Sequence, residues 1–385
     1  MNTRNANMLS YGKAIGILLG SRLVVFLAML FSARFVTPSI HAAGESNIPW
    51  YQYLLRWDAG WYLQIVRDGY SHTGDDLTQQ SINFSPVYPW LCQAVAVLLH
   101  IQPGVALVLV ANVLFVAGVL LLFKLIRDDY GEEVSLVAVA TLCFFPSSVF
   151  FSAGYTESLA LVLIAGCFLS IKSKRFILAS VLIGLAVGTR LMSLVLIPPL
   201  LWEMWREMAP NKKRFFLNGV TTLILATSGL WLYMIYLWVA FNRPFAIVTS
   251  KKAWHGSGSE GELFKVVTFQ TFGHLADIWR DGPIPETLAP WIFLGFIVLL
   301  IAFRKVLPTS YTLFAAGSLA MPYYLASGNR GFGSFTRYVM LSFPFFIILG
   351  EIFRRHLWLG LTMIGLFTAL LFMHAAFYAQ AYWAG

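Results

Sequence analysis

Long apolar segments separated by short basic clusters constrain this chain more than any other feature of its sequence. Several segments stay apolar for about 20 residues, the length that an α-helix needs to cross a bilayer. Of the 385 residues, 58% are hydrophobic and only 12% are charged, whereas an ordinary soluble domain carries about 25% charged residues. A β-barrel would show short alternating segments instead. The sequence therefore predicts an all-α polytopic membrane protein, with one integral membrane domain over residues 1–385.

The basic clusters predict how these segments are threaded. Lysine and arginine collect in the inner loops of membrane proteins, and a threading with about ten spans places every cluster on one side. The net charge of +9 lies largely in these clusters, so it gives no support for nucleic-acid binding. The clusters are Lys172–Arg175, Lys212–Arg214, Arg304–Lys305 and Arg354–Arg355. The expected spans are 13–35, 105–123, 134–151, 155–171, 176–189, 191–205, 215–241, 291–303, 311–325, 338–352 and 358–378.

The same threading leaves three larger loops on the outer side. The first loop covers residues 36–103 and is expected to carry two surface helices, because its apolar segment near 87–100 is too short to span comfortably. The other two loops are residues 242–289 and residues 326–337, the latter rich in glycine. One charged residue, Arg22, lies inside the first expected span. A side chain that snorkels toward the inner surface is the simplest explanation for it.

In the first outer loop, Asp58 sits among aromatic residues. Trp57, Trp61 and Tyr62 surround it at helical spacing, which predicts a short helix on the membrane surface. One interpretation is a solvated carboxylate beside interfacial tryptophans. The other is a carboxylate at the mouth of a membrane cavity, where partial desolvation would make it a usable general base. This pattern alone does not decide between them.

Four more charged residues are expected on the outer side, at or just below the membrane surface. Glu157 follows a proline break and is either a carboxylate that stabilises a helix start or part of a site. Arg190 lies at a turn between two apolar runs and is either an interfacial arginine or part of the same site. Arg330 and Arg337 flank a glycine-rich turn, and such a pair suits a phosphate, which arginine binds with two parallel bonds. One cavity could hold all four residues together with Asp58.

Several classes of function have no support in the sequence. It contains no Walker loop, no Rossmann glycine fingerprint and no H-E-x-x-H motif, so neither nucleotide-sugar use nor ATP-driven transport is indicated. The three cysteines form no disulfide framework or zinc spacing. Histidines in the outer loops are more often solvated than ligands. We therefore predict no metal site from them, and the need for a divalent cation stays open.

At these residues the chain resembles a known family, GPI mannosyltransferase 2. Trp57-Asp58-Ala59, followed by Ile65 and Gly69-Tyr70, is similar to the family's W-D-A…I-A…G-Y signature. Asn83–Pro89 resembles its F-x-P-L-Y-P segment. Phe145–Ser148 with Tyr155–Ser158 resembles its F-P-S…Y-S-E-S, and Arg337-Tyr338 with Phe343-Pro344 resembles its R-Y…P. The matches fall in order between residues 56 and 344.

The resemblance implies a fold and a reaction. The family belongs to the GT-C class of membrane glycosyltransferases, so a GT-C-like helix bundle is expected. The donor would be a polyprenyl-phosphate-linked sugar, with mannose preferred, and the transfer would invert the anomeric centre on the outer face. The acceptor stays open among a glycolipid, a glycan and a protein, and membrane lipids surround the enzyme. Some GT-C enzymes use a divalent metal.

The resemblance also suggests roles for single residues. Asp58 would be the catalytic base, and the donor phosphate would be bound by Arg337 and Arg330, with Arg190 next. The remaining residues would bind substrate: Glu157, Trp57, Trp61, Tyr62, Tyr155 and Tyr338. The chain is short for a eukaryotic member and shows no address for the endoplasmic reticulum. A bacterial plasma membrane, with the active site facing outward, is therefore expected; a eukaryotic member would lie in the membrane of the endoplasmic reticulum.

Two alternatives remain at this stage. A transporter or flippase of a lipid-linked sugar needs the same lipid, cavity and arginines, but it needs no base. A structural subunit of a membrane complex fits less well, because so many charges gather at one outer mouth.

Overall fold

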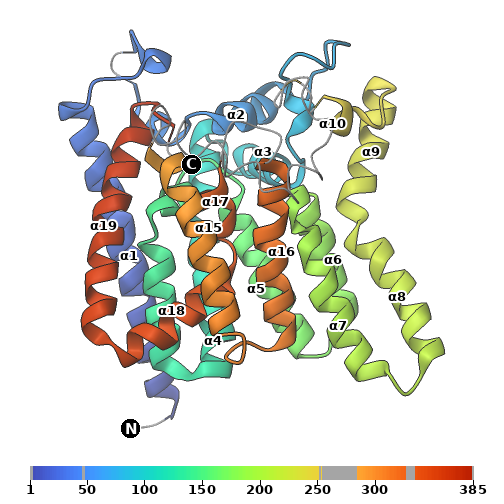
Figure 1. The fold of residues 1–385 in the computed structure, drawn as a ribbon. Helices are drawn as coiled ribbons and strands as arrows, with labels where there is room; N and C mark the ends of the chain where they lie inside the picture. Colours follow the sequence, from blue (N-terminus) through green and yellow to red (C-terminus); the bar gives the residue numbers. More distant parts are fainter. Residues whose placement is uncertain (1–2, 46–47, 251–252, 254–283, 327–333, 384–385) are drawn as a thin grey trace.

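The computed structural model describes residues 3–45, 48–250, 253, 284–326 and 334–383. In these ranges the regular secondary structure is all helical, without a strand. Most of the longer helices run side by side between two ends of the molecule, with the N-terminus at the lower end and α2, α3 and α10 at the upper end (Figure 1). The all-α membrane architecture expected from the sequence is confirmed.

Five short 3₁₀ segments interrupt the helices between residues 40 and 196 of the described chain. The first elements are α1 (Thr3–Phe35), η1 (Ile40–Ala42), η2 (Trp50–Leu54), α2 (Asp58–Asp68), η3 (Ser81–Asn83), α3 (Val87–Leu99), α4 (Pro103–Cys143), η4 (Pro146–Phe151), α5 (Glu157–Lys172) and α6 (Phe176–Val187). They are followed by η5 (Leu191–Leu196), α7 (Ile197–Met208), α8 (Lys212–Ala226), α9 (Ser228–Phe241), α10 (Ala246–Thr249), α15 (Ile284–Ala302), α16 (Thr309–Ala326), α17 (Phe335–Val339), α18 (Phe343–Arg355) and α19 (Leu357–Ala379).

Three helices in the described part are long and apolar enough to cross a membrane: Met8–Phe35, Pro103–Cys143 and Leu357–Ala379. The pair Phe215–Ala226 and Ser228–Phe241, bent by 49°, would make a fourth span. The other expected spans are present as shorter or interrupted helices. The expected helix 338–352, for example, is divided between α17 and α18.

The central helix is α4, which packs against α1, α3, α5 and α18. It joins two expected spans across a kink at Gly131, whose φ of 85° is a backbone conformation that glycine adopts without steric cost. Its buried Phe115 and Phe123 form part of the core. On the outside of the bundle, α1 exposes Leu19, Leu23 and Leu30, as a helix facing lipid does.

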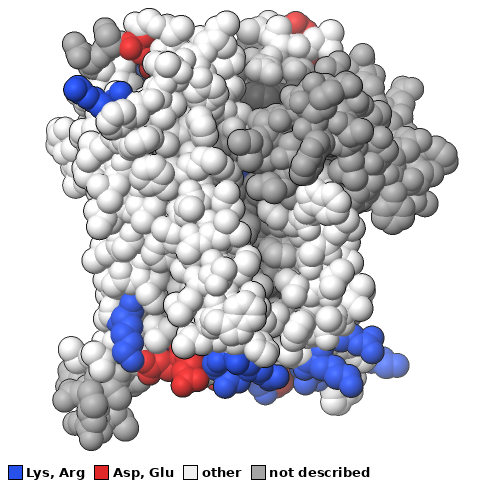
Figure 2. Space-filling model, turned by 60° about the vertical axis from the view of Figure 1, so that its left-hand side comes forward, with Lys and Arg blue, Asp and Glu red and all other residues white. Residues whose placement is uncertain are grey.

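Charged residues lie at the upper and lower ends of the face shown in Figure 2, with an uncharged band between them. Figure 2 shows lysine and arginine gathered at the lower end of one face, with an uncharged band above them. The turns between α7 and α8, between α15 and α16 and between α18 and α19 lie at this lower end (Figure 1). They adjoin Lys212–Arg214, Arg304–Lys305 and Arg354–Arg355. Three expected inner clusters therefore lie at the end of the bundle opposite α2.

A glycine contact fixes α6 against α9. A Cβ atom added to Gly229 would lie 2.1 Å from the carbonyl oxygen of Gly184 and 2.2 Å from the amide nitrogen of Gly188. The Gly188 carbonyl in turn accepts a hydrogen bond of 3.0 Å from the amide of Val87, at the start of α3. This contact places the residues that follow α6, including Arg190, beneath the surface helices.

Candidate functional site

Four charged side chains from four parts of the chain meet toward the upper end of the bundle. Asp58 is the first residue of α2, Glu157 is the first residue of α5, Arg190 precedes η5 and Arg337 lies in α17. Arg337 joins the two acids: its Nη1 donates to Asp58 Oδ2 at 2.9 Å, and its Nε lies 3.1 Å from Glu157 Oε1. Arg190 Nη1 donates to the same Glu157 oxygen at 2.7 Å. We call these four residues the charged network.

Burial differs sharply between the two carboxylates of the network. The side chain of Glu157 is 0% exposed, and the arginines beside it are 9% exposed at Arg190 and 7% at Arg337. Asp58 keeps 24% of its side chain exposed. Charged groups this deep are retained only when they are paired, and a second molecule can reach Asp58 but not Glu157.

The local backbone around Asp58 is unusual. Trp57 precedes it with φ 57° and ψ −123°, a strained conformation for a residue with a side chain. The Trp57 ring packs edge-on against Trp383, at 5.4 Å between centroids, and its Nε1 donates to the Tyr382 carbonyl at 3.3 Å. Asp58 itself lies at the N-terminus of α2, where the helix dipole favours a negative charge. The C-terminal segment thus holds the turn that presents this carboxylate.

Glu157 is held by the 3₁₀ segment that precedes its helix. The next residue, Ser158, donates from its hydroxyl to the carbonyl of Phe151, the last residue of η4, at 2.9 Å. Arg337 Nε and Glu157 Oε1 form an ion pair without hydrogen-bond geometry, because Nε has no hydrogen-bond partner among the described residues. Within the same part of the chain, Glu157 Oε2 is buried without a hydrogen bond. The network therefore retains capacity for one more donor.

Aromatic rings enclose the Arg337 guanidinium. Its Cζ lies 5.0 Å from the ring centroid of Tyr338, 5.2 Å from that of Tyr155 and 5.4 Å from that of Phe150. The two carboxylates that Nη1 and Nε contact stabilise the positive charge of this buried guanidinium. Arg337 is thus a buried cation in contact with both acids.

The phenol of Tyr62 lies on the inner face of α2, where its ring packs against Tyr155 at 6.4 Å. Burial, with the charges of Asp58 and Glu157, raises the pKa of Tyr62. A phenol in this setting stays protonated near neutral pH, so it does not compete with a carboxylate as a base.

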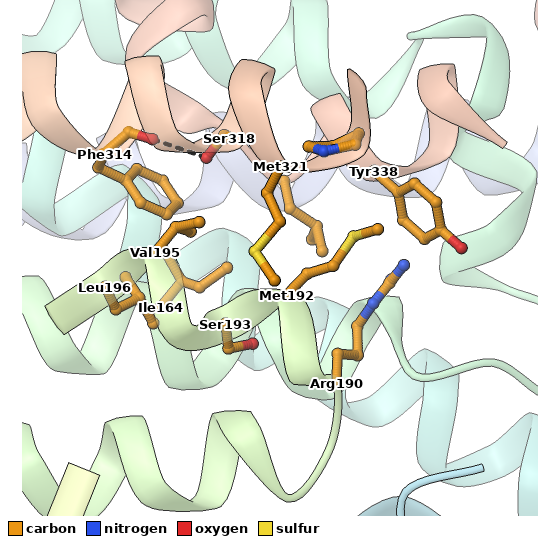
Figure 3. A pocket seen from close by; sticks show the side chains of 12 residues that line it. Ile164, Arg190, Met192, Ser193, Val195, Leu196, Phe314, Ser318, Met321 and Tyr338 are labelled. Carbon is orange, nitrogen blue, oxygen red and sulfur yellow. Dashed lines mark hydrogen bonds between the residues drawn. The ribbon is translucent and has the colours of Figure 1, made fainter. Parts of the chain in front are cut away.

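A narrow apolar groove begins at Arg190 and Tyr338 and runs along η5 and α16 (Figure 3). The Arg190 guanidinium and the Tyr338 ring lie at one end, with Cζ 4.8 Å from the ring centroid. Met192 and Met321 lie in the middle of the groove, and Phe314 lies at the far end (Figure 3). The groove holds about 410 Å³ of space not filled by atoms, its open side included. Arg190, not Arg337, is the arginine of the network that lines it.

The structure brings together most of the residues singled out in the sequence, and Trp57, Tyr62, Tyr155 and Tyr338 pack around or beside the network. Trp61 stacks on Phe84 at 5.9 Å, one turn further along α2. Arg330 lies outside the described residues, as do most of the loops 242–289 and 326–337.

Three residues at the site were missed by sequence reasoning. Phe150 and Trp383 lie beside the Arg337 guanidinium, and the hydroxyl of Tyr378 donates to the carbonyl of Arg56 at 3.1 Å. Only Phe150 carried a signal, since it falls between two motifs that resemble the family. The described residues contain no group of three or more histidine, cysteine, aspartate or glutamate side chains that could hold a metal ion.

No curated protein matches the chain. Among solved structures it is similar to the oligosaccharyltransferase of Archaeoglobus fulgidus in the apo form, with 13% identity and a TM-score of 0.48, over 95% of this chain and 56% of that one. It is also similar to AglB of the same organism in complex with an inhibitory peptide and a dolichol-phosphate, with 14% identity and a TM-score of 0.45, over 95% of this chain and 56% of the other.

The chain thus spans just over half the length of these structural neighbours. A family model described as mannosyltransferase (PIG-V) matches residues 27–241, which is more than half of the 385 residues. This stretch contains Asp58, Glu157 and Arg190. The chain is a member of the mannosyltransferase (PIG-V) family.

Proposed function

We propose that this protein is an inverting glycosyltransferase that moves mannose from a polyprenyl-phosphate donor to an acceptor at the outer face of the membrane. One observation carries the proposal. A partly exposed carboxylate, Asp58, lies in the same charged network as an arginine, Arg190, that opens onto an apolar groove. A transfer from a lipid phosphate needs these parts side by side: a base, a cation for the phosphate and an apolar path for the lipid.

Asp58 suits the role of general base. Arg337 holds Oδ2, and Oδ1 has no hydrogen-bond partner among the described residues. In the proposed step, Asp58 takes the proton of the acceptor hydroxyl while that oxygen forms a bond to the anomeric carbon. The bond from the anomeric carbon to the phosphate oxygen breaks, and its electron pair leaves with the phosphate. One displacement of this kind inverts the anomeric centre.

The donor phosphate is assigned to the end of the groove where Arg190 and Tyr338 meet. Arg190 donates from Nη1 to Glu157 and also lines the groove. Its guanidinium can therefore stabilise the charge that develops on the leaving phosphate. Arg337, which the sequence ranked first for this role, is instead enclosed by rings and carboxylates and is proposed to orient Asp58 and Glu157. Arg330 remains a candidate second phosphate ligand on the sequence argument alone.

The remaining assignments follow from the same site. The groove is lined by Ile164, Val195 and Leu196 besides its methionines, which suits a polyprenyl chain that enters from the membrane. The acceptor, a glycolipid, a glycan or a protein, would approach Asp58 from the upper end, where Trp61 and Tyr338 are partly exposed. With the basic clusters inside, this end faces outward, in a bacterial plasma membrane or in the endoplasmic reticulum.

A transfer assay tests the proposal. Purified protein is incubated with polyprenyl-phosphate-mannose and a panel of lipid, glycan and peptide acceptors, and the products are analysed by mass. We expect one acceptor to gain one hexose as polyprenyl phosphate is released. A flippase would instead move the intact donor from one leaflet of a vesicle membrane to the other, and the Asp58→Asn variant would do so equally well. That result would support the transporter and contradict the proposed glycosyltransferase.

A further inference from the structure

Arg22, in the middle of α1, does not extend toward the lower surface as expected from the sequence. A guanidinium carries five N–H groups, and all five are used. Nη1 donates to the Ser148 carbonyl at 2.9 Å and to Ser152 Oγ at 2.8 Å. Nη2 donates to Ser148 Oγ at 2.6 Å and to the Cys143 carbonyl at 3.2 Å, and Nε donates to Ser21 Oγ at 3.2 Å.

Four of these bonds contact the segment in which the central helix α4 ends and η4 follows. Helix α4 ends at Cys143, and Pro146 begins the 3₁₀ segment η4. Backbone carbonyls at such a break lack helical partners and are costly to leave unpaired within a membrane. The Arg22 guanidinium donates to two carbonyls at this break, those of Cys143 and Ser148. It also packs over Phe115 at 4.7 Å, and that ring stacks on Phe151 at 4.4 Å.

The segment that Arg22 holds is the one that positions the charged network. Phe151 of η4 accepts the hydrogen bond of Ser158, the neighbour of Glu157. Phe150 packs beside the Arg337 guanidinium and against Tyr155, at 5.0 Å between ring centroids. Arg22 itself reaches none of these charged side chains with a described hydrogen bond or ion pair. Its effect on them must pass through η4.

We infer that Arg22 is a positioning residue: it fixes η4, and through η4 it fixes Glu157 and Arg337 relative to Asp58. The kinetic part of this inference rests on the proposed transfer reaction, whereas the structural part does not. Lysine cannot replace Arg22, because it has three donors on one atom and cannot span four acceptors of the break. A displacement of about 1 Å at a reacting group can cost about 10²-fold in rate.

The kinetic test compares Arg22→Lys with a matched control, Arg127→Lys. Arg127 also joins α1 to α4, through the rings of Tyr11 at 4.9 Å and Phe123 at 5.5 Å, but it does so away from η4. Transfer is measured on monodisperse protein, well below each melting temperature. We expect Arg22→Lys to lower the maximal rate by about 10- to 100-fold and Arg127→Lys to stay within about threefold of wild type.

A double substitution keeps the inference testable if Arg22→Lys does not fold. Ser148→Ala with Ser152→Ala removes two of the hydroxyl acceptors and leaves the arginine in place. We expect this variant to lower the rate in the same direction, and an unchanged rate would overturn the inference. Where Arg22→Lys folds, its combination with the serine pair should be no slower than Arg22→Lys alone, within about threefold. Fully additive losses would show that the arginine and the serines act separately, and they would overturn the inference.

Hydrogen exchange provides a readout that does not depend on the reaction. The amides of Ser148, Ser152 and Ala153 are bonded within η4 and its C-terminal turn. We expect faster exchange in peptides covering residues 144–158 in Arg22→Lys and no change there in Arg127→Lys. Equal exchange in the two variants would overturn the inference. If the wild-type protein transfers no mannose but Arg22→Lys still exchanges faster than Arg127→Lys in this segment, the inference stands. Only the proposed function would then fail.

Discussion

Replacing Asp58 by asparagine separates catalysis from stability more cleanly than any other change at this site. The amide has nearly the same shape, so no cavity forms. Arg337 Nη1, now 2.9 Å from the carboxylate, can still donate to the amide oxygen, and Arg337 keeps its ion pair with Glu157. What is lost is the negative charge and the ability to take a proton. We expect Asp58→Asn to fold and to bind donor, but to lose transfer.

The expected effects of Asp58→Asn on stability and on the transfer rate differ in size. A hydrogen bond to a charged group contributes about 1.5–3 kcal/mol and a neutral one about 0.5–1.5 kcal/mol, so the change should cost about 1–1.5 kcal/mol of stability. Loss of a general base typically lowers the rate by about 10²–10⁴-fold. At about 1.36 kcal/mol for each factor of ten, this corresponds to about 2.7–5.4 kcal/mol in the barrier. The rate should therefore fall far more than unfolding could explain.

The assay is the initial rate of transfer at saturating donor, with the melting temperature recorded on the same sample. Asp68→Asn is the matched control, because Asp68 ends the same helix and is also paired with an arginine, Arg67 Nη2 at 2.7 Å. That control should keep the wild-type rate. A rate for Asp58→Asn within about threefold of wild type, or an equal loss in Asp68→Asn, would refute Asp58 as the base. Glu157 would not inherit the role easily, since its side chain is fully buried.

Three further predictions concern the groove, the packing and the orientation. Arg190→Ala should weaken donor binding by about 10- to 100-fold, as loss of a charge-assisted hydrogen bond implies, and Arg190→Lys should recover only part of it; an unchanged apparent donor affinity would place the phosphate elsewhere. Gly229→Ala should lower stability by about 1–3 kcal/mol or more through overpacking, because its Cβ would lie 2.1 Å from the Gly184 carbonyl oxygen; an unchanged melting temperature would mean that α6 and α9 separate freely. Cysteines at positions 75 and 213 should be labelled from opposite sides of the membrane, and labelling from one side would contradict the threading.

The sequence predicted the helices of this protein and their ends better than the contacts between distant residues. Apolar length and basic clusters indicated the helices, and the proline at 146 indicated the break after α4. Glu157 and Arg190 were expected near Asp58 because each follows an interruption of an apolar run on the same side. Such interruptions mark where helices end, and helix ends on one side of a membrane are brought close together by the bundle.

The partners depend on contacts between distant residues, which periodicity does not encode. Arg337 was expected to bind the donor phosphate, and its sequence position does not reveal the rings from η4 and from the end of the chain that lie beside it. Arg22 was expected to extend along its helix, because nothing near it in sequence reveals the Ser148 and Ser152 acceptors, more than 120 residues away. A charged residue within an apolar run predicts that a partner exists, but not which one.

The pairing of Asp58 and Glu157 with Arg190 and Arg337 has a consequence for charge conservation. Two carboxylates and two guanidinium groups give the network no formal net charge. A lipid phosphodiester would add one negative charge. When Asp58 takes the acceptor proton, the network becomes positive by one unit at the moment that the departing phosphate gains its second negative charge. The total stays at minus one from donor to product, so the proposed step only moves charge from one wall of the site to the other, and no counter-ion has to enter or leave during it.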